Sequence, residues 1–353
     1  MGEPLAHGLD RDRLLDLHRA MCLSRAAEER LEVLQRQGHV KGSIYRSLGQ
    51  EAGAVGAAYA LDRRSDGSGD FLAHTVRAPG ALFLFGGQLE DFFRQYLARS
   101  TSPTGGKETD VHWGDFQRGF IGPVWSLGTM LEVMAGITLS FKMRGEERVG
   151  LVFHGDGATG TGAWHEGLNF AAVQRCPLVL VVENNQYAFS TPRSRTSRLV
   201  SFVQKAPGYG IHAESVDGTD VLAVYDAVER AAGQARAGQG VHMVELHYFR
   251  RMGHAQHDAQ EYMDPQVIAT WEQKDPVDRY AARILAEGWA TPAEVDAIWR
   301  ESVDACVEAS QRALDDPEPR GPEALEGVTT DGRLPVPWTR VEPPDPRRSS
   351  KPA

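Results

Sequence analysis

The chain is poor in cysteine, and none of its apolar runs is long enough to cross a membrane. Its three cysteines, Cys22, Cys176 and Cys306, lie far apart, so the sequence offers neither a disulfide framework nor a paired thiol site for a metal or for redox chemistry. Buried, reduced thiols are expected. Lysine and arginine are outnumbered by aspartate and glutamate, 38 to 48, and the net charge of −10 argues against nucleic acid as the main partner.

The amino-terminal segment also lacks targeting features. Residues 1–7 have neither the Arg-rich amphipathic character of a transit peptide nor the apolar core of a signal peptide, and Ala6 breaks the myristoylation pattern. We therefore expect a reducing cytoplasm. With 353 residues and 41% hydrophobic content, the chain can bury one large α/β core with helical extensions.

The most informative stretch of the sequence is a predicted strand–helix–strand unit. Two continuous apolar segments, 149–154 and 178–183, have the pattern of parallel strands buried on both faces. Between them Trp164, Leu168 and Ala171 fall at i, i+4 and i+7, which predicts one buried stripe of a helix.

Polar residues follow both predicted strands directly. A Gly-Asp-Gly triplet at 155–157 ends the first strand, a Glu-Asn-Asn triplet at 183–185 ends the second, and Asn185 follows Asp156 by 29 residues. This spacing suits a single crossover between parallel strands. Ligands of open parallel sheets bind at the carboxyl ends of the strands. We therefore expect a carboxylate and an amide to lie close together beside a glycine turn that can cradle a phosphate.

Two phosphate ligands compete for this site, because residues 155–160 also satisfy the weak dinucleotide pattern G-x-G-x-x-G. In a nicotinamide or flavin site Asp156 would face the pyrophosphate directly. Two like charges about 4 Å apart repel by about 1 kcal/mol in water and about 4 kcal/mol at an effective dielectric of about 20. A divalent cation reverses this sign, since Asp156 then becomes a ligand. Charge therefore favours a metal–diphosphate site over a dinucleotide site.

Magnesium prefers six oxygens in octahedral geometry and often takes one or two carboxylates together with substrate phosphates. Asp156, the side-chain oxygen of Asn185 and a nearby main-chain carbonyl such as that of Tyr187 would supply the protein ligands. The structural alternative is a glycine turn in which Asp156 caps the following helix. Such a cap does not account for the two asparagines at the next strand end.

With these residues in view, the chain resembles a known family. The Gly-Asp-Gly turn, followed after a helix by Asn-Asn, is similar to the thiamine diphosphate motif. Residues 10–315 resemble the alpha subunit of the decarboxylating component of 2-oxo acid dehydrogenase complexes, the pyruvate, branched-chain 2-oxo acid and acetoin dehydrogenases. Further blocks that carry the resemblance are 48–52, 74–80, 111–114, 207–210, 216–220 and 252–255.

The resemblance implies a fold and a set of site residues. The fold would be the thiamine diphosphate-binding fold, a doubly wound, mainly parallel α/β sheet with helices on both faces and helical extensions at both ends. Arg77 would contact the diphosphate, Leu127 would lie beside the thiazolium ring, and His254 would be the active-site histidine. The residues implied for the cofactor are Arg77, Ser126, Leu127, Gly155, Asp156, Gly157, Ala158, Asn185, Tyr187 and His254, of which Asp156, Asn185 and Tyr187 would also hold magnesium.

The resemblance also implies a function. Thiamine diphosphate and magnesium would support oxidative decarboxylation of pyruvate or a branched-chain 2-oxo acid, with acyl transfer to a lipoyl group of the acyltransferase core. A separate beta subunit would complete the site in an α₂β₂ assembly, because the chain contains a single diphosphate-type unit. A nicotinamide-dependent Rossmann oxidoreductase and a non-catalytic paralogous scaffold subunit remain as alternatives, and the choice of 2-oxo acid stays open.

Three positions depart from the family pattern. Val76 replaces the tyrosine that usually precedes Arg77, and Tyr45 stands where many relatives carry a histidine. Ala255 replaces a serine that is phosphorylated in mitochondrial relatives, and residues 253–264 contain no serine or threonine. We therefore expect no kinase switch in this loop.

The remaining sequence pattern places helices and strands around the central unit. A helix from 11 to 37, capped by Asp10 and closed by Gly38, is predicted. Other helices are expected at 50–60, 81–99, 221–236, 276–287 and 292–314, and strands at 211–216 and 241–248. Arg250 and Arg251, after the last strand, could face the diphosphate, but they are interpreted as surface residues. The expected domains are a helical extension at 1–40, the thiamine diphosphate-binding domain at 41–315, and a proline-rich, extended or disordered tail at 316–353.

Overall fold

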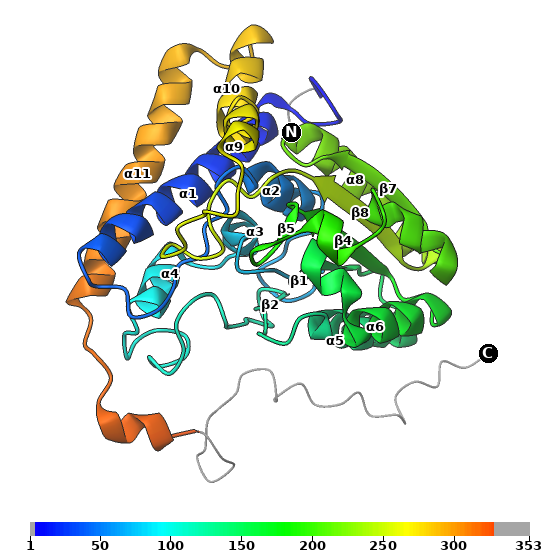
Figure 1. The fold of residues 1–353 in the computed structure, drawn as a ribbon, viewed down its shortest axis with the longest axis horizontal. Helices are drawn as coiled ribbons and strands as arrows, with labels where there is room; N and C mark the ends of the chain where they lie inside the picture. Colours follow the sequence, from blue (N-terminus) through cyan, green and yellow to red (C-terminus); the bar gives the residue numbers. More distant parts are fainter. Residues whose placement is uncertain (1–3, 328–353) are drawn as a thin grey trace.

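The computed structural model describes residues 4–327 of the chain (Figure 1). Its strands are β1 (Phe71–Ala73), β2 (Phe120–Ile121), β3 (Gly150–Gly155), β4 (Leu178–Asn184), β5 (Tyr187–Ala188), β6 (Thr191–Pro192), β7 (His212–Asp217) and β8 (His242–His247). Its helices are α1 (Arg11–Arg36), α2 (Glu51–Tyr59), α3 (Pro79–Leu84), α4 (Leu89–Tyr96), α5 (Thr129–Arg144), α6 (Gly162–Val173), α7 (Arg193–Thr196), α8 (Val221–Gln234), α9 (Pro265–Glu272), α10 (Pro276–Ala286) and α11 (Pro292–Asp315).

Within residues 4–327 the strands form a six-stranded sheet of order β2-β1-β3-β4-β8-β7, whose neighbouring strands are all parallel, and a small antiparallel hairpin of β5 and β6. The apolar runs of β3 and β4 lie at the centre of the large sheet and are buried, as expected of parallel strands covered on both faces. Gly155 pairs with Glu183 at the end of these two strands. The Gly-Asp-Gly turn and the asparagine pair therefore leave the sheet side by side.

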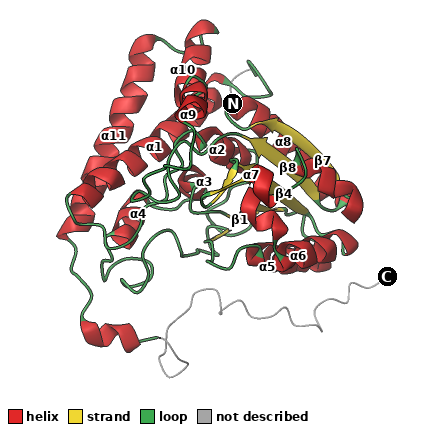
Figure 2. Cartoon of the chain, viewed as in Figure 1, coloured by secondary structure: helices red, strands yellow, loops and turns green. Residues whose placement is uncertain are grey.

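Helices cover both faces of the sheet (Figure 2). On one face α5 and α6 pack over Val152 and Leu180, and Trp164 from α6 is fully buried there. On the other face α1, α2 and α8 pack over Leu151 and Val181. This arrangement confirms the predicted α/β class, a parallel sheet between two helical layers.

The start and end of α1 follow the predicted sequence signals. The side chain of Asp10 accepts a hydrogen bond from the backbone N–H of Arg13 at 3.0 Å, which caps the helix. Gly38, with φ +81°, lies just beyond its end. The C-terminal helices return to α1 (Figure 1): the hydroxyl of Tyr280 in α10 donates to the carbonyl of Leu14 at 3.0 Å.

The region from 81 to 99 differs from the single helix that the sequence predicts. It forms α3 and α4, with a turn at Gly86 and Gly87 between them. Gly86 has a left-handed φ of +86°, and a Cβ atom at Gly87 would lie 2.5 Å from Cγ of Leu82. The apolar periodicity across this turn did not reveal the break. The pattern also did not indicate α5, α9 or the short strands β1 and β2.

The first part of the predicted tail packs along the loop that follows α4. The backbone N–H of Ser100 donates to the carbonyl of Pro317 at 3.0 Å, and the hydroxyl of Thr101 donates to Asp316 at 2.7 Å. A turn of 3₁₀ helix follows at Gly321–Leu325, where the sequence predicts an extended or disordered chain. The rest of the predicted tail, 328–353, lies outside the described residues.

The three cysteines are buried and unpaired, as predicted. Across residues 4–327 no helix combines the length and the apolar character that a membrane crossing requires.

Candidate active site

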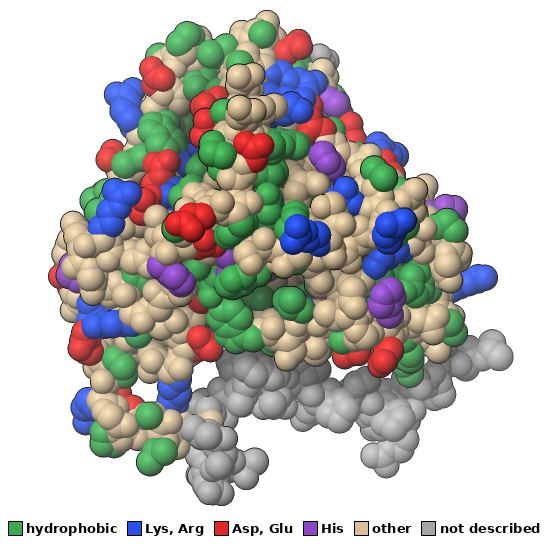
Figure 3. Space-filling model, in the orientation of Figure 1, with side chains coloured by type: hydrophobic (Ala, Val, Ile, Leu, Met, Phe, Trp, Pro, Cys, Tyr) green, Lys and Arg blue, Asp and Glu red, His purple; other side chains and the backbone are tan. Residues whose placement is uncertain are grey.

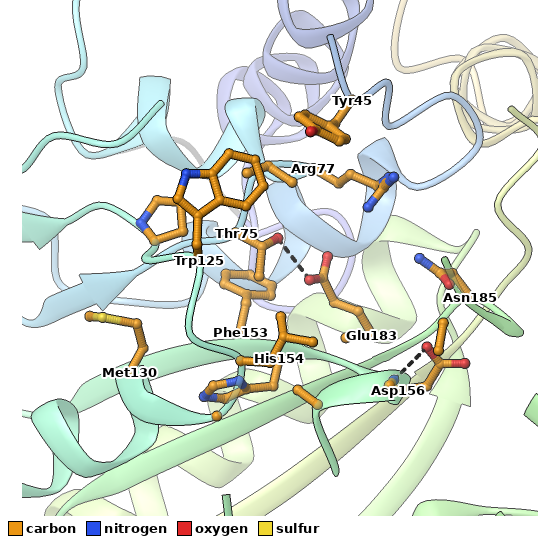
Figure 4. Close-up of a pocket in the computed structure, with 18 of the residues that line it drawn as sticks. Tyr45, Thr75, Arg77, Trp125, Met130, Phe153, His154, Asp156, Glu183 and Asn185 are labelled. Carbon is orange, nitrogen blue, oxygen red and sulfur yellow. Dashed lines mark hydrogen bonds between the residues drawn. The ribbon is translucent and has the colours of Figure 1, made fainter. Parts of the chain in front are cut away.

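The predicted cofactor residues come together in one pocket at the carboxyl ends of β1, β3 and β4 (Figure 4). All of them contribute to its lining: Arg77, Ser126, Leu127, Gly155, Asp156, Gly157, Ala158, Asn185, Tyr187 and His254. This is the edge at which open parallel sheets bind their ligands. The structure thus assembles residues that are up to 177 positions apart in the chain, as for Arg77 and His254.

Asp156 and Asn185 form an oxygen-rich corner of the pocket. Oδ1 of Asp156 accepts the N–H of Gly157 at 2.8 Å, whereas Oδ2 is buried with no hydrogen-bond partner among residues 4–327. Burial raises the pKa of Asp156 to about 6. Nδ2 of Asn185 donates to Gln50 at 3.0 Å, and Oδ1 accepts the N–H of Tyr187 at 3.3 Å. A hard cation at this corner fits the orphaned carboxylate oxygen and the oriented amide oxygen.

The glycine turn is closely covered by the hairpin β5–β6. A Cβ atom at Gly157 would lie 2.6 Å from Cβ of Ala188, so a larger residue would push the hairpin away. The hairpin itself is sharply folded, because Gln186 and Phe189 adopt left-handed φ angles of +73° and +56°. The turn and the hairpin together bring backbone close to the oxygen-rich corner.

Two arginines face the same pocket, the half-buried Arg77 and the buried Arg250. Arg77 donates to the carbonyl of His254 at 2.5 Å, and burial lowers its pKa to about 10. Arg250 is only 1% exposed and donates to the carbonyl of Phe189 at 2.7 Å and to the hydroxyl of Tyr262 at 2.6 Å. The surface interpretation of Arg250 is therefore wrong. Its position three residues after the end of strand β8, at the ligand-binding edge of the sheet, is the sequence signal that could have revealed it.

His254 lies between two aromatic rings of the pocket wall. Its ring centroid is 4.1 Å from that of Phe189 and 5.2 Å from that of Tyr45. Burial, together with the positive charge of Arg77, lowers the pKa of His254 to about 4, so the imidazole is neutral near pH 7. Asp258 fixes the backbone of this loop by accepting the N–H of His254 at 2.7 Å. A neutral imidazole can both donate and accept a hydrogen bond.

Other residues of the pocket were not indicated by the sequence. Glu183 is buried, which raises its pKa, and accepts hydrogen bonds from the hydroxyl groups of Thr75 at 2.8 Å and Tyr248 at 3.2 Å. His154, one residue before the glycine turn, is buried, which lowers its pKa to about 4. Nε2 of His154 has no hydrogen-bond partner in the described part of the chain.

Aromatic rings from five loops line one wall of the pocket, and we call this set the aromatic arc. Its members are, in spatial order, Phe189, His254, Tyr45, Trp125 and His112. In Figure 4 the indole of Trp125 lies on the side of the pocket opposite to Asp156 and Asn185. The pocket therefore has an oxygen-rich end and an aromatic end.

Comparison with known proteins identifies the family of this chain. Residues 18–321 match the dehydrogenase E1 component family. The alpha subunit of acetoin:2,6-dichlorophenolindophenol oxidoreductase from Cupriavidus necator is 34% identical over 318 residues, which cover 90% of this chain and 94% of that protein. The pyruvate dehydrogenase E1 component subunit alpha of Rhizobium meliloti is 31% identical, with 86% of each chain covered. The 2-oxoisovalerate dehydrogenase subunit alpha of Bacillus subtilis is 30% identical, with 92% and 97% covered.

The chain therefore belongs to the dehydrogenase E1 component family. Its relatives are alpha subunits of pyruvate, 2-oxoisovalerate and acetoin-oxidising enzymes, so it is an oxidoreductase of the 2-oxo acid dehydrogenase type. Among the enzyme classes that the sequence left open, the family match therefore supports a 2-oxo acid dehydrogenase over a nicotinamide-dependent Rossmann oxidoreductase.

Proposed function

We propose that this chain is the alpha subunit of a thiamine diphosphate- and magnesium-dependent E1 dehydrogenase. It would decarboxylate pyruvate or a branched-chain 2-oxo acid and pass the acyl group to a lipoyl domain of an acyltransferase core. One observation carries the proposal: the buried, unpartnered Oδ2 of Asp156 lies at a strand end beside the oriented amide of Asn185. The names of the relatives support the same chemistry.

Each end of the pocket has a distinct task in this proposal. Asp156, Asn185 and the carbonyl of Tyr187 would hold magnesium, while the guanidinium groups of Arg77 and Arg250 would face the diphosphate. Bound thiamine diphosphate would supply the carbanion stabilisation that a 2-oxo acid needs to lose carbon dioxide.

His254 would act on the substrate and not on the metal. It stands in the wall between the two ends of the pocket, and its imidazole is neutral, since burial lowers its pKa to about 4. It would hydrogen-bond the reacting group and move a proton during acyl transfer. The hydrogen bond from its backbone N–H to Asp258 holds the loop in place for this role. Because Asp156, Asn185, Arg77 and His254 occupy one pocket, the chain is better interpreted as a catalytic subunit than as a scaffold.

The proposal includes a separate beta subunit in an α₂β₂ assembly. The chain has one diphosphate-type unit, and the enzymes it resembles take a glutamate for the aminopyrimidine ring from a second domain. Large apolar side chains at the pocket support a partner there, because Trp125, Leu127 and Phe189 are about 60% exposed. The buried, unpaired cysteines agree with a reducing compartment, which we propose to be the cytoplasm.

Calorimetric titration of the complex, purified through a tag on this chain, tests the cofactor assignment. The wild-type complex should bind thiamine diphosphate with Mg²⁺ and bind it poorly when the metal is chelated. D156A and N185A should each weaken cofactor binding by about 10–100-fold or more. Loss of a residue that merely hydrogen-bonds a metal ligand already weakens metal binding by about 10–100-fold.

D304A, which removes an exposed carboxylate of α11, is the matched control and should leave cofactor affinity unchanged. Unchanged affinity in both D156A and N185A would refute the metal assignment. Turnover of a 2-oxo acid by this chain with no partner present would refute the requirement for a beta subunit.

A further inference from the structure

The aromatic end of the pocket bears on which substrate the enzyme accepts, if the proposed function holds. The aromatic arc is continuous: ring centroids are 5.8 Å apart for Tyr45 and Trp125 and 4.7 Å apart for Trp125 and His112. Both contacts are edge-on, the arrangement that aromatic pairs favour. The ring of Trp125 therefore has an aromatic contact on each of two sides, although the residue is 60% exposed at the pocket mouth.

The order of residues along the arc gives the direction in which a substrate substituent points. The diphosphate end is set by Asp156 and Asn185, and Phe189 follows Asn185 in the same loop. His254 comes next, beside the reacting group. A substituent that points away from the diphosphate would therefore pass His254 and meet Tyr45 and then Trp125, in the order of their ring contacts.

The charge at this end selects among substituents. The ionisable side chains of the pocket lining, apart from its histidines and tyrosines, are Arg77, Asp156, Glu183 and Arg250. Around Trp125 the lining is instead apolar, with Val124, Leu127 and Met130. Behind the arc, the carboxylate of Glu108 lies 3.6 Å from Nδ1 of His112. An uncharged substituent fits this end, whereas a second carboxylate would lose its hydration and face a like charge.

We propose that Trp125 is a specificity-determining residue that limits the acyl substituent to about the size of a methyl group. The indole occupies the space into which a longer side chain of a 2-oxo acid would extend, and its two ring contacts keep it from turning aside. Pyruvate-sized substrates are accepted, and branched substrates such as 4-methyl-2-oxopentanoate are rejected by overlap with the indole. This inference rests on the proposed function, because it takes the diphosphate to lie at Asp156 and Asn185.

The test compares variants of the chain, tagged and purified together with its natural partner subunit. The measured quantity is the ratio of kcat/KM for 4-methyl-2-oxopentanoate to kcat/KM for pyruvate. We expect W125A to raise this ratio at least about tenfold, because one extra or missing methylene group in a hydrophobic pocket is worth about 10–200-fold in discrimination. W125F, which keeps a ring in the arc, should raise it less. V200A, which trims a side chain that is 77% exposed and outside the pocket lining, should leave it unchanged.

Three results would overturn the inference. The first is a ratio in W125A that stays within about threefold of wild type while both substrates are turned over, because threefold is well below the discrimination expected from steric misfit. The second is loss of the partner subunit from both W125A and W125F, because the substitutions would then act through assembly of the complex and not on the substrate. The third is a wild-type complex that decarboxylates neither substrate, and this result would refute the proposed function as well.

Discussion

Gly157 is a residue at which a single methyl group should disturb the cofactor site. A Cβ atom there would lie 2.6 Å from Cβ of Ala188 in the covering hairpin. We expect G157A to displace this hairpin and to weaken binding of thiamine diphosphate with Mg²⁺ by roughly tenfold, or about 1.4 kcal/mol. G160A, in the same turn, has no atom within 4 Å of its new Cβ and should bind normally. Calorimetric titration measures the cofactor affinity of both variants. Equal affinities would show that the hairpin moves to admit the methyl group without weakening cofactor binding.

At the residue scale, the strand pattern alone predicted the site at Asp156 and Asn185, whereas loop residues such as Arg77 and His254 were predicted only through the family resemblance. Asp156 and Asn185 could be placed together because adjacent parallel strands end at the same edge of a sheet. Trp125 and His112 touch across two irregular loops, and no periodic pattern encodes such a contact. Arg250 was misjudged because a basic pair has no burial signal of its own, and its partners lie on two different loops.

At the scale of elements, the packing of α2 against α8 depends on a glycine. A Cβ atom at Gly56 would lie 2.7 Å from the carbonyl oxygen of Val221 and 3.0 Å from Cβ of Val224. We expect G56A to lower the free energy of unfolding by about 1–3 kcal/mol, because backbone must move to admit the methyl group. G233A is the control on α8, because no atom lies within 4 Å of the Cβ that it adds. It should raise the free energy of unfolding by about 0.5–1 kcal/mol. Urea unfolding of both variants tests this, and a stabilised G56A would contradict it.

The junction between α1 and the loop before α2 should be sensitive to pH through Glu28. Both carboxylate oxygens of this residue accept the backbone N–H of Ser47, at 2.9 and 2.8 Å. Burial raises the pKa of Glu28 from 4.5 to about 7, against the opposing effect of Arg46. Since the folded protein favours the protonated form, the stability that this group contributes is full below about pH 4.5 and is lost as pH rises through about 7.

E28Q keeps an acceptor for Ser47 but cannot titrate. The free energy of unfolding of wild type minus that of E28Q should therefore fall by up to about 3 kcal/mol between pH 4.5 and pH 8. Because the comparison is a difference, groups that titrate in both proteins cancel. A difference that does not change with pH would mean that Glu28 has the same pKa in the folded and the unfolded protein.

The sequence predicted long elements well and interrupted ones poorly. Helix α1 was placed from its Asp10 cap, and β7, β8 and α8 appear close to their expected bounds. The predicted helix at 81–99 is two helices, because local geometry at Gly86 and Gly87 overrides a continuous apolar stripe. Strands β1 and β2 have three and two residues, too few for any alternation to be recognised.

At the scale of the whole molecule, the pocket mouth carries more apolar surface than a lone subunit needs. Val124, Trp125, Leu127 and Phe189 are each between 46% and 62% exposed, and all of them line the pocket. Hydrophobic side chains gather around a hollow on the face shown in Figure 3. Exposed apolar groups that rim a binding site are typical of surfaces that a partner covers.

Hydrogen exchange can locate the partner subunit on this surface. If it closes the mouth, amide exchange at 123–128 and 186–190 should slow by about tenfold or more on pairing, because loop backbone that opens easily when free is held by the contact. The helix α10, which packs on α1 away from the pocket, is the internal control and should exchange at the same rate in both states. An assembled complex in which both loops exchange as fast as in the free chain would place the partner elsewhere. In that case the substrate, and not the partner, would contact the exposed indole of Trp125, and the aromatic end of the pocket would open to solvent during turnover.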